Sequence, residues 1–338
     1  MAEAAARLRG FRDGSLDAAD VLAAPILVVD ADLDGDPAEL DVPPAFPAVV
    51  VAVARAAAPA LSRRGPDVAI TALGQPLPPW VTEPEPQGAA ARLVARVMAA
   101  PGAAITLVGV LRAGRDAGIE GGLLLESLAY SMLQSGPEFS EWKKGRPPPP
   151  DRPAVGPAVL VERAGDRLEI TLNRPHVHNA YDREMRDGLC EALAVAHADP
   201  NLSVLIRGAG PSFCSGGDLD EFGTFPDPVT SHLVRTGRSP ARLLAALAAR
   251  TTVVVHGSCA GSGIELPAFA GRVVAHPGSR MWLPELRMGL IPGAGGTVSV
   301  ARRVGAGRAA WMALSGEPVD AVTAWSWGLV DEVSGQGD

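Results

Sequence analysis

The chain contains few aromatic residues and few cysteines. Aromatics make up 4% of its 338 residues, so the core must be built mostly from alanine, valine and leucine. The three cysteines, Cys190, Cys214 and Cys259, are scattered, odd in number and without CxxC spacing. This pattern disfavours a disulfide framework or a zinc site, and it predicts a reducing, cytoplasmic location.

The chain also has no excess of basic residues and no long apolar run. The net charge is −8, which argues against a general nucleic-acid surface. The N-terminus MAEAAARLRG lacks the apolar stretch of a signal peptide. The longest apolar tract, 45–61, is interrupted by Pro47, Arg55 and Pro59, so it is too broken to span a bilayer. We therefore expect neither nucleic acid nor a membrane as a partner.

Proline divides the chain into two parts. Residues 146–153 read RPPPPDRP, a stretch that can join neither a helix nor a sheet ladder and favours an extended spacer. We predict an N-terminal α/β region at 1–145, a linker at 146–157 and a second domain at 158–338. A looser tract, 74–88, is expected to be an exposed loop.

The first part alternates short apolar runs with alanine-rich stretches, which indicates an α/β unit. A helix is expected over 88–100, and no phosphate-binding glycine loop follows any of the apolar runs. The simplest interpretation is a structural layer or interaction module. The runs expected to form strands are Ile26–Val29, Val49–Val53, Val68–Ala72 and Ile105–Val110.

Residues 121–146 have the period of an amphipathic helix. Leu124, Leu128 and Met132 fall on one stripe, with Leu125 and Ala129 beside it. Gly136-Pro137 should end this helix, and 138–142 should begin another turn.

The second part predicts a repeating strand–turn–helix pattern. Asp182 is a plausible N-cap for a helix whose inner face carries Met185, Leu189 and Leu193. Successive ββα turns of a spiral would produce such a pattern. The expected strands are Leu168–Leu172, Leu202–Arg207, Thr252–His256 and Arg272–Ala275.

Three motifs in this part carry chemical information. They read FCSGGDL (213–219), HGSCAGSGIEL (256–266) and LPELRMGLIPGAGGT (283–297). In this order and spacing the chain resembles the crotonase (enoyl-CoA hydratase/isomerase) superfamily from about residue 158 to 333. The resemblance implies a crotonase-like α/β spiral, preceded here by a smaller α/β region.

The helical tail that closes relatives of this kind has no counterpart after GLVDEV, since five residues follow that motif. Residues 121–146 resemble such a tail. We therefore expect the N-terminal part to supply the missing helices, with an ordinary amphipathic helix as the equal alternative.

The resemblance assigns a reaction chemistry to the motifs. Backbone N–H groups of Gly217 and Ser262 would form an oxyanion hole for a thioester enolate. Serine at 262 departs from the glycine usual in relatives; its hydroxyl could crowd the substrate or hydrogen-bond to it. Ser262 would begin a helix reading GIELPAF, whose dipole would help the site. Glu265 would activate water, and Glu285 would protonate Cα.

The resemblance also implies where an acyl-CoA would bind. Coenzyme A enters as part of the substrate, and no other cofactor is expected. The pair His176 and His178 lacks an acidic or cysteine partner at ligand spacing, so no metal is expected either. The implied CoA-binding residues are Arg174, His178, Asn179, Ala180, Ser215, Gly216, Asp218 and Leu219. The implied acyl-pocket residues are Pro284, Gly289, Pro292 and Gly293.

Three functions remain open from the sequence. The leading one is hydration of a 2-enoyl-CoA, or the reverse dehydration. A double-bond isomerase, or a hydratase or dehydratase acting on an alicyclic or aromatic acyl-CoA, could use the same two glutamates. A non-catalytic acyl-CoA-binding partner subunit is the alternative from another class. The resemblance further implies a homo-oligomer, either a trimer or a hexamer.

Overall fold

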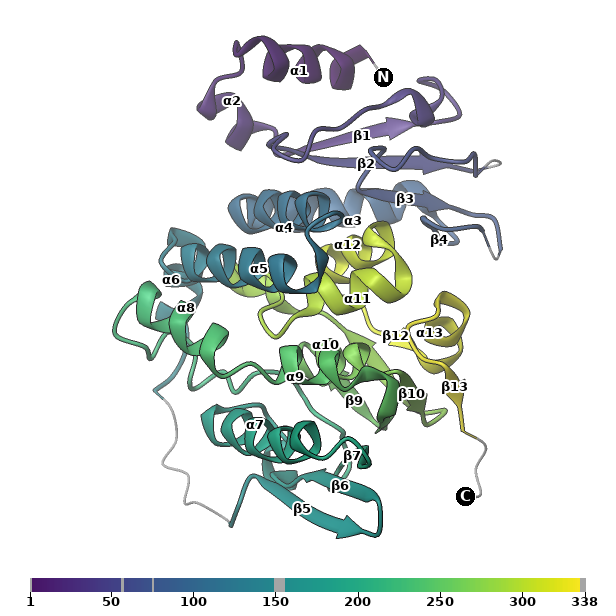
Figure 1. The fold of residues 1–338 in the computed structure, drawn as a ribbon. Coiled ribbons are helices and arrows are strands. Elements are labelled where there is room, and N and C mark those ends of the chain that lie inside the picture. The colour runs from purple at the N-terminus through teal and green to yellow at the C-terminus, as the bar shows by residue number, and fades with distance from the viewer. Residues whose placement is uncertain (1, 56–57, 75, 149–155, 335–338) are drawn as a thin grey trace.

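The computed structural model describes residues 2–55, 58–74, 76–148 and 156–334. Its first layers are two helices, a four-stranded parallel sheet in the order β1-β2-β3-β4, and two further helices against the other face (Figure 1). The central strands β2 and β3 are buried throughout, which suits their apolar sequences rich in β-branched residues. The elements are α1 (Ala2–Asp13), α2 (Ala18–Ala23), β1 (Ile26–Asp30), β2 (Val49–Ala54), β3 (Val68–Thr71), β4 (Trp80–Thr82), α3 (Pro86–Ala99) and α4 (Pro101–Gly114).

Two predictions for this part are wrong. The run 105–110 lies inside α4, not in a strand, because α4 is buried around much of its circumference and a short apolar run does not reveal its period. Pro101 begins that helix at a position where its missing N–H is harmless. The tract 74–88 is not wholly a loop, since it contains β4, where Trp80 is buried and donates from Nε1 to the Pro59 carbonyl at 2.8 Å.

Among the described residues, no single helix is long and apolar enough to cross a membrane. The pair α3 and α4 together would pass on length and composition, but the two helices meet at a bend of 109°.

Helices α5 (Gly118–Gln134) and α6 (Pro137–Lys144) follow, and the predicted break at Gly136-Pro137 is confirmed. The leucine stripe of α5 lies on its outer surface: Leu124, Leu128 and Met132 are all about half exposed. The inward face of α5 instead carries Glu126, Ser127, Tyr130 and Leu133. The side of α5 that faces the protein is therefore the more polar one.

The second part winds as successive ββα turns, and its predicted strands are confirmed. A six-stranded sheet has the order β13-β10-β8-β7-β6-β5, and a small sheet has the order β12-β11-β9. The strands are β5 (Val159–Ala164), β6 (Arg167–Leu172), β7 (Ser203–Gly208), β8 (Thr251–Val255), β9 (Ser258–Ala260), β10 (Arg272–Ala275), β11 (Arg280–Trp282), β12 (Val319–Asp320) and β13 (Glu332–Val333).

Helices cover these sheets. Asp182 caps the first of them, as predicted, by accepting from the Met185 N–H at 2.9 Å, and Met185, Leu189 and Leu193 are buried. The helices are α7 (Arg183–Ala198), α8 (Pro228–Gly237), α9 (Pro240–Ala246), α10 (Ser262–Glu265), α11 (Gly296–Val304), α12 (Ala306–Ser315) and α13 (Ala321–Trp327). Short 3₁₀ turns η1 (Pro37–Glu39), η2 (Pro175–Val177), η3 (Ala248–Arg250), η4 (Pro267–Phe269) and η5 (Glu285–Met288) complete the set.

One hydrophobic core runs through both parts. It includes Leu93 and Leu107 from α3 and α4 as well as Val253 and Leu314 from the second part. Helices α11 and α12 pack against α4, and α5 packs against α8 (Figure 1). Residues 149–155 of the predicted linker lie outside the described residues, so a domain boundary there stays a prediction.

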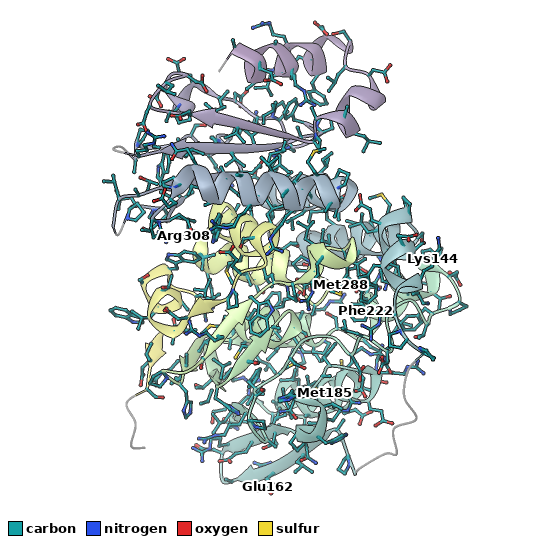
Figure 2. The ribbon with its side chains drawn as sticks, turned by 180° about the vertical axis from the view of Figure 1, so that it is seen from behind. Lys144, Glu162, Met185, Phe222, Met288 and Arg308 are labelled. Atoms are coloured by element: carbon teal, nitrogen blue, oxygen red, sulfur yellow. The ribbon has the colours of Figure 1, made fainter. Side chains whose placement is uncertain are left out.

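Helix α6 completes the contact between the parts. Phe139 stacks on Trp142 with ring centroids 5.5 Å apart, and Trp142 lies 6.3 Å from the ring of Phe222. Lys143 Nζ donates to the Gly223 carbonyl at 2.7 Å. Lys144 and Phe222 lie on the same side of the molecule in Figure 2. Helix α6 is therefore fixed to the loop that follows the first predicted oxyanion motif.

Candidate active site

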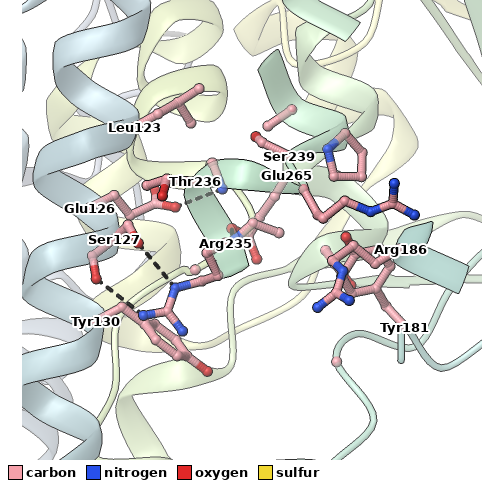
Figure 3. A pocket seen from close by; sticks show the side chains of 18 of the residues that line it. Leu123, Glu126, Ser127, Tyr130, Tyr181, Arg186, Arg235, Thr236, Ser239 and Glu265 are labelled. Carbon is pink, nitrogen blue, oxygen red and sulfur yellow. Dashed lines mark hydrogen bonds between the residues drawn. The ribbon is translucent and has the colours of Figure 1, made fainter. Parts of the chain in front are cut away.

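A cavity of about 470 Å³ lies where α5, α8 and α9 meet the loops of the second part (Figure 3). Gly217, Ser262, Glu265 and Glu285 all line it, so the structure brings the predicted catalytic and oxyanion residues together. Its walls also include residues of α5, which lie far away in the sequence.

The two predicted oxyanion donors are held by backbone pairing. Tyr181 bridges to Gly217, and Cys214 bridges to Cys259 just before Ser262. Among the hydrogen bonds of the described residues, neither the Gly217 N–H nor the Ser262 N–H finds a protein acceptor. Both N–H groups therefore remain available to an oxygen atom bound in the cavity.

Ser262 begins a helix, but a shorter one than predicted. Helix α10 ends at Glu265, and Pro267 then begins the 3₁₀ turn η4. Leu266 still has α-helical backbone angles, but Pro267 offers no N–H to continue the helical hydrogen bonds. The side chain of Ser262 is buried, with Oγ 3.7 Å from Cys214 Sγ.

Glu265 and Glu285 converge on one glycine. Gly261 has a φ of +48°, and a Cβ added to it would lie 2.4 Å from Oε1 of Glu285 and 3.6 Å from Oε1 of Glu265. Only glycine allows this backbone conformation and this approach of two carboxyl groups. Oε2 of Glu265 accepts from the Ala294 N–H at 2.8 Å and the Gly296 N–H at 2.9 Å. Oε2 of Glu285 is buried and has no hydrogen-bond partner among the described residues.

Burial shifts the titration of both carboxyl groups. It raises the pKa of Glu285 to about 8, with Glu126 adding to the effect. Burial, then the charges of Glu285 and Glu126, raise the pKa of Glu265 well above its usual value. Like charges in one buried site disfavour each other, so ionisation of one carboxyl group makes ionisation of the other harder.

A third buried carboxylate, Glu126, was missed from the sequence. It is 2% exposed and comes from α5. It accepts from the N–H of Gly295 at 2.7 Å, the N–H of Thr297 at 2.9 Å and the Thr297 hydroxyl at 2.6 Å. Burial raises the pKa of Glu126 to about 7. The only sequence signal was a charged residue on the helix face opposite the leucine stripe.

Glu126 and Glu265 thus bind four consecutive backbone N–H groups in alternation. Glu265 takes those of Ala294 and Gly296, and Glu126 takes those of Gly295 and Thr297. These groups open α11, where a helix leaves its first N–H groups without internal partners. Two carboxylates on opposite sides therefore hold the turn before α11.

The residues predicted to bind CoA form a network of their own. Arg174 pairs with Asp182 at 3.0 Å and with Asp218 at 3.2 Å, and it donates to the Ala180 carbonyl. Asn179 is fully buried, accepts from the Arg174 N–H and donates to the carbonyls of Ala209 and Ser212. Asp218 lines the cavity, whereas Arg174, His178, Asn179 and Ala180 do not. Their role in binding CoA stays a prediction.

The remaining predicted residues surround the cavity at different depths. Gly293 lines it, against the ring of Tyr130. Gly289 instead lies against Glu138 and Phe139 of α6. The other predicted residues that do not line the cavity are Ser215, Gly216, Leu219, Pro284, Gly289 and Pro292.

Comparison with known proteins assigns the chain to a family. Residues 164–338 match the family model described as enoyl-CoA hydratase/isomerase. The chain belongs to the enoyl-CoA hydratase/isomerase family. The predicted resemblance to the crotonase superfamily is thereby confirmed.

Two curated relatives in this family illustrate its range. A 2,3-dehydroadipyl-CoA hydratase of Escherichia coli is 35% identical over 52% of this chain and 68% of its own length. A 1,2-epoxyphenylacetyl-CoA isomerase of the same organism is 33% identical over 49% of this chain and 65% of its own. Among solved structures, an enoyl-CoA hydratase of Thermoplasma volcanium matches 53% of this chain and 72% of its own, at 31% identity and a TM-score of 0.47.

Proposed function

We propose that the protein adds water across the 2,3 double bond of a 2-enoyl-CoA thioester, or removes it in reverse. The observation that carries the proposal is the convergence of Glu265 and Glu285 on Gly261, inside a cavity that also offers two unused backbone N–H groups. Hydration needs a base for water and an acid for Cα, and this pair can supply both.

The surroundings of the two carboxyl groups suggest the division of work. Two backbone N–H groups stabilise the ionised form of Glu265, and the charge of Glu285, which helps to raise the pKa of Glu265, is absent while Glu285 is protonated. Glu285 has no such support at Oε2, so we assign the proton to Glu285 and the role of base to Glu265. In the proposed step Glu265 takes a proton from water as its oxygen bonds to Cβ, and Glu285 then delivers a proton to Cα.

The N–H groups of Gly217 and Ser262 would accommodate the charge that forms on the thioester oxygen. Negative charge moves to that oxygen when water adds to Cβ, and it returns when Cα is protonated. Donors already fixed in place lose no energy to reorganisation, and each contributes about 3–4 kcal/mol to such a transition state. The buried position of Ser262 favours this role.

Turnover of CoA esters tests the proposal. Purified protein should hydrate at least one member of a panel of straight-chain, cyclic and aromatic 2-enoyl-CoA esters. Glu285→Gln, which removes the acid, should lower kcat by at least about 100-fold. Glu184→Gln, on the exposed first turn of α7, should retain wild-type activity. Double-bond migration without water uptake would replace hydration by isomerisation, and tight acyl-CoA binding without any reaction would favour a non-catalytic subunit.

A further inference from the structure

The wall of the cavity formed by α5 and α8 is polar. Ser127 and Tyr130 of α5 face Arg235 of α8 (Figure 3). His232, also of α8, contacts Ser127 and lines the same cavity. Glu265 and Glu285 line the same cavity, and the Tyr130 ring packs against Gly293. An acyl group bound beside Glu265 and Glu285 can therefore extend toward this wall.

Arg235 is held entirely by neutral partners. It donates to Ser127 Oγ and the Ser127 carbonyl at 3.2 Å each, to Ser231 Oγ at 2.6 Å, and to Ser131 Oγ. Its guanidinium carbon lies 4.7 Å from the centre of the Tyr130 ring. A guanidinium has five N–H groups, so one N–H at Nη1 is left over.

No carboxylate of the described residues forms an ion pair with Arg235, although Glu126 acts on it through space. Two other largely buried arginines, Arg112 and Arg174, each pair with aspartate. Arg308 also lacks a carboxylate but lies outside the cavity, against the backbone carbonyls of Pro76 and Trp80. Burying a cation without a directly paired carboxylate is costly. Binding of an anion at Arg235 would reduce this cost.

Neighbouring groups add further hydrogen-bonding capacity. Nδ1 of His232 lies 3.0 Å from Ser127 Oγ, which leaves Nε2 without a partner among the described residues. In the tautomer in which Ser127 donates to Nδ1, Nε2 carries its proton. The Tyr130 hydroxyl also has no hydrogen-bond partner among the described residues, and Tyr130 as a whole is 7% exposed. These groups, with the free N–H of Arg235, line a single wall of the cavity.

We propose that the acyl group of the substrate ends in a carboxylate, which binds to Arg235 with hydrogen bonds from His232 and Tyr130. The inference rests on the proposed function and deepens it by naming a substrate class, the ω-carboxyacyl-CoA thioesters. Because Arg235, Glu265 and Glu285 line one cavity of about 470 Å³, the acyl chain is short. Apolar side chains such as Leu123 and Phe222 line the same cavity and suit its methylene groups.

Matched substrate pairs test this inference. Each ω-carboxy-2-enoyl-CoA is assayed beside the methyl-terminated ester with the same number of carbons. The wild-type protein should favour the carboxylate member of the best pair by about 10-fold or more in kcat/KM, as expected for a charge-assisted hydrogen bond. Arg235→Met should abolish this preference, and Arg235→Lys should retain part of it. Turnover of the methyl-terminated ester by the same variant reports whether its site is intact.

Binding separates this inference from the proposed reaction. Saturated acyl-CoA esters, one ending in carboxylate and one in methyl, are titrated calorimetrically into wild-type protein, Arg235→Met and Arg163→Met. Arg163 lies on β5 with a side chain 59% exposed, so its variant should behave as wild type. Tighter binding of the carboxylate ester, lost only in Arg235→Met, supports the inference even if hydration is never observed. Equal or tighter binding of the methyl ester by wild-type protein overturns it.

Discussion

At the scale of single residues, the turn before α11 joins the N-terminal part of the chain to the reaction site. Glu126 and Glu265 bind alternate N–H groups of residues 294–297. Movement of Glu126 would therefore change the turn against which Glu265 is aligned. Glu126 does not touch the point near Gly261 where the other two carboxylates converge, so it is a positioning residue.

Replacing Glu126 by glutamine tests this role. The amide keeps one acceptor oxygen but turns an NH₂ group toward Gly295 or Thr297, so a backbone N–H loses its partner in a buried place. We expect kcat to fall by about 10-fold or more with little change in KM, since such a loss costs roughly 1–3 kcal/mol. Amide hydrogen exchange at 294–297 should accelerate. A purely structural role for Glu126 would lower the melting temperature without affecting kcat.

The control is Glu141→Gln, in the neighbouring helix α6. Glu141 is 78% exposed, and within the described part of the chain its one ion pair is with Lys144 at 3.1 Å. Both its kinetics and its hydrogen exchange should match those of the wild-type protein.

At the scale of helices and strands, local signals predicted elements well where they were unambiguous. The valine run of β2, the Asp182 cap and the Gly136-Pro137 break all have a single local interpretation. The run 105–110 has no single interpretation, because a helix buried on most sides has the same continuous apolar sequence as a buried strand. The stripe on α5 illustrates a second limit, since periodicity shows that a helix has two faces but not which face is buried.

Packing of α6 against η5 provides a prediction at this scale. Gly289 ends η5 with a φ of +68°, and a Cβ there would lie 2.6 Å from Glu138 Cβ and 2.7 Å from the Phe139 nitrogen. Gly289→Ala should lower the free energy of unfolding by about 2 kcal/mol or more, through backbone strain and overpacking together. Activity should also fall, because η5 begins with Glu285.

Chemical denaturation of this variant beside Gly278→Ala measures the effect. A Cβ at Gly278 would meet nothing within 4 Å, so this matched change should be close to neutral. Equal free energies of unfolding for the two variants would mean that α6 can move away from residue 289 without loss of stability, contrary to the tight contact with η5.

At the scale of the whole molecule, the site is assembled from distant parts of the chain. The motifs at 213–219, 256–266 and 283–297 predicted the residues that the second part contributes. Glu126, Tyr130 and Arg235 carry no motif, and they become relevant only because α5 and α8 pack side by side in three dimensions. Sequence reasoning on one segment at a time could not place them in the cavity. The shared core, from Leu93 to Leu314, explains why α5 holds its position.

The same assembly buries three carboxyl groups together, which predicts how stability depends on pH. The pKa values of Glu126 and Glu285 are raised to about 7 and about 8, and that of Glu265 is also raised, mainly by burial. Their usual value is 4.5, so above this pH the folded chain binds more protons than the unfolded chain. Stabilisation from these groups is complete below about pH 4.5 and is lost as the pH rises through about 7 and 8.

Thermal unfolding between about pH 5 and pH 8 should therefore show a melting temperature that falls with increasing pH. Glu285→Gln cannot ionise at this position, so its melting temperature should fall less steeply and exceed that of the wild-type protein near pH 8. Glu184→Gln should leave the slope unchanged. If the melting temperature of Glu285→Gln depends on pH as steeply as that of the wild-type protein, and the variant keeps most of its activity, Glu285 is not the proton-holding acid. We expect Glu285→Gln to be more stable than the wild-type protein near pH 8 but less active. Hydration requires a group that holds a proton near neutral pH, and the buried Glu285 carboxyl group supplies it at a cost in stability.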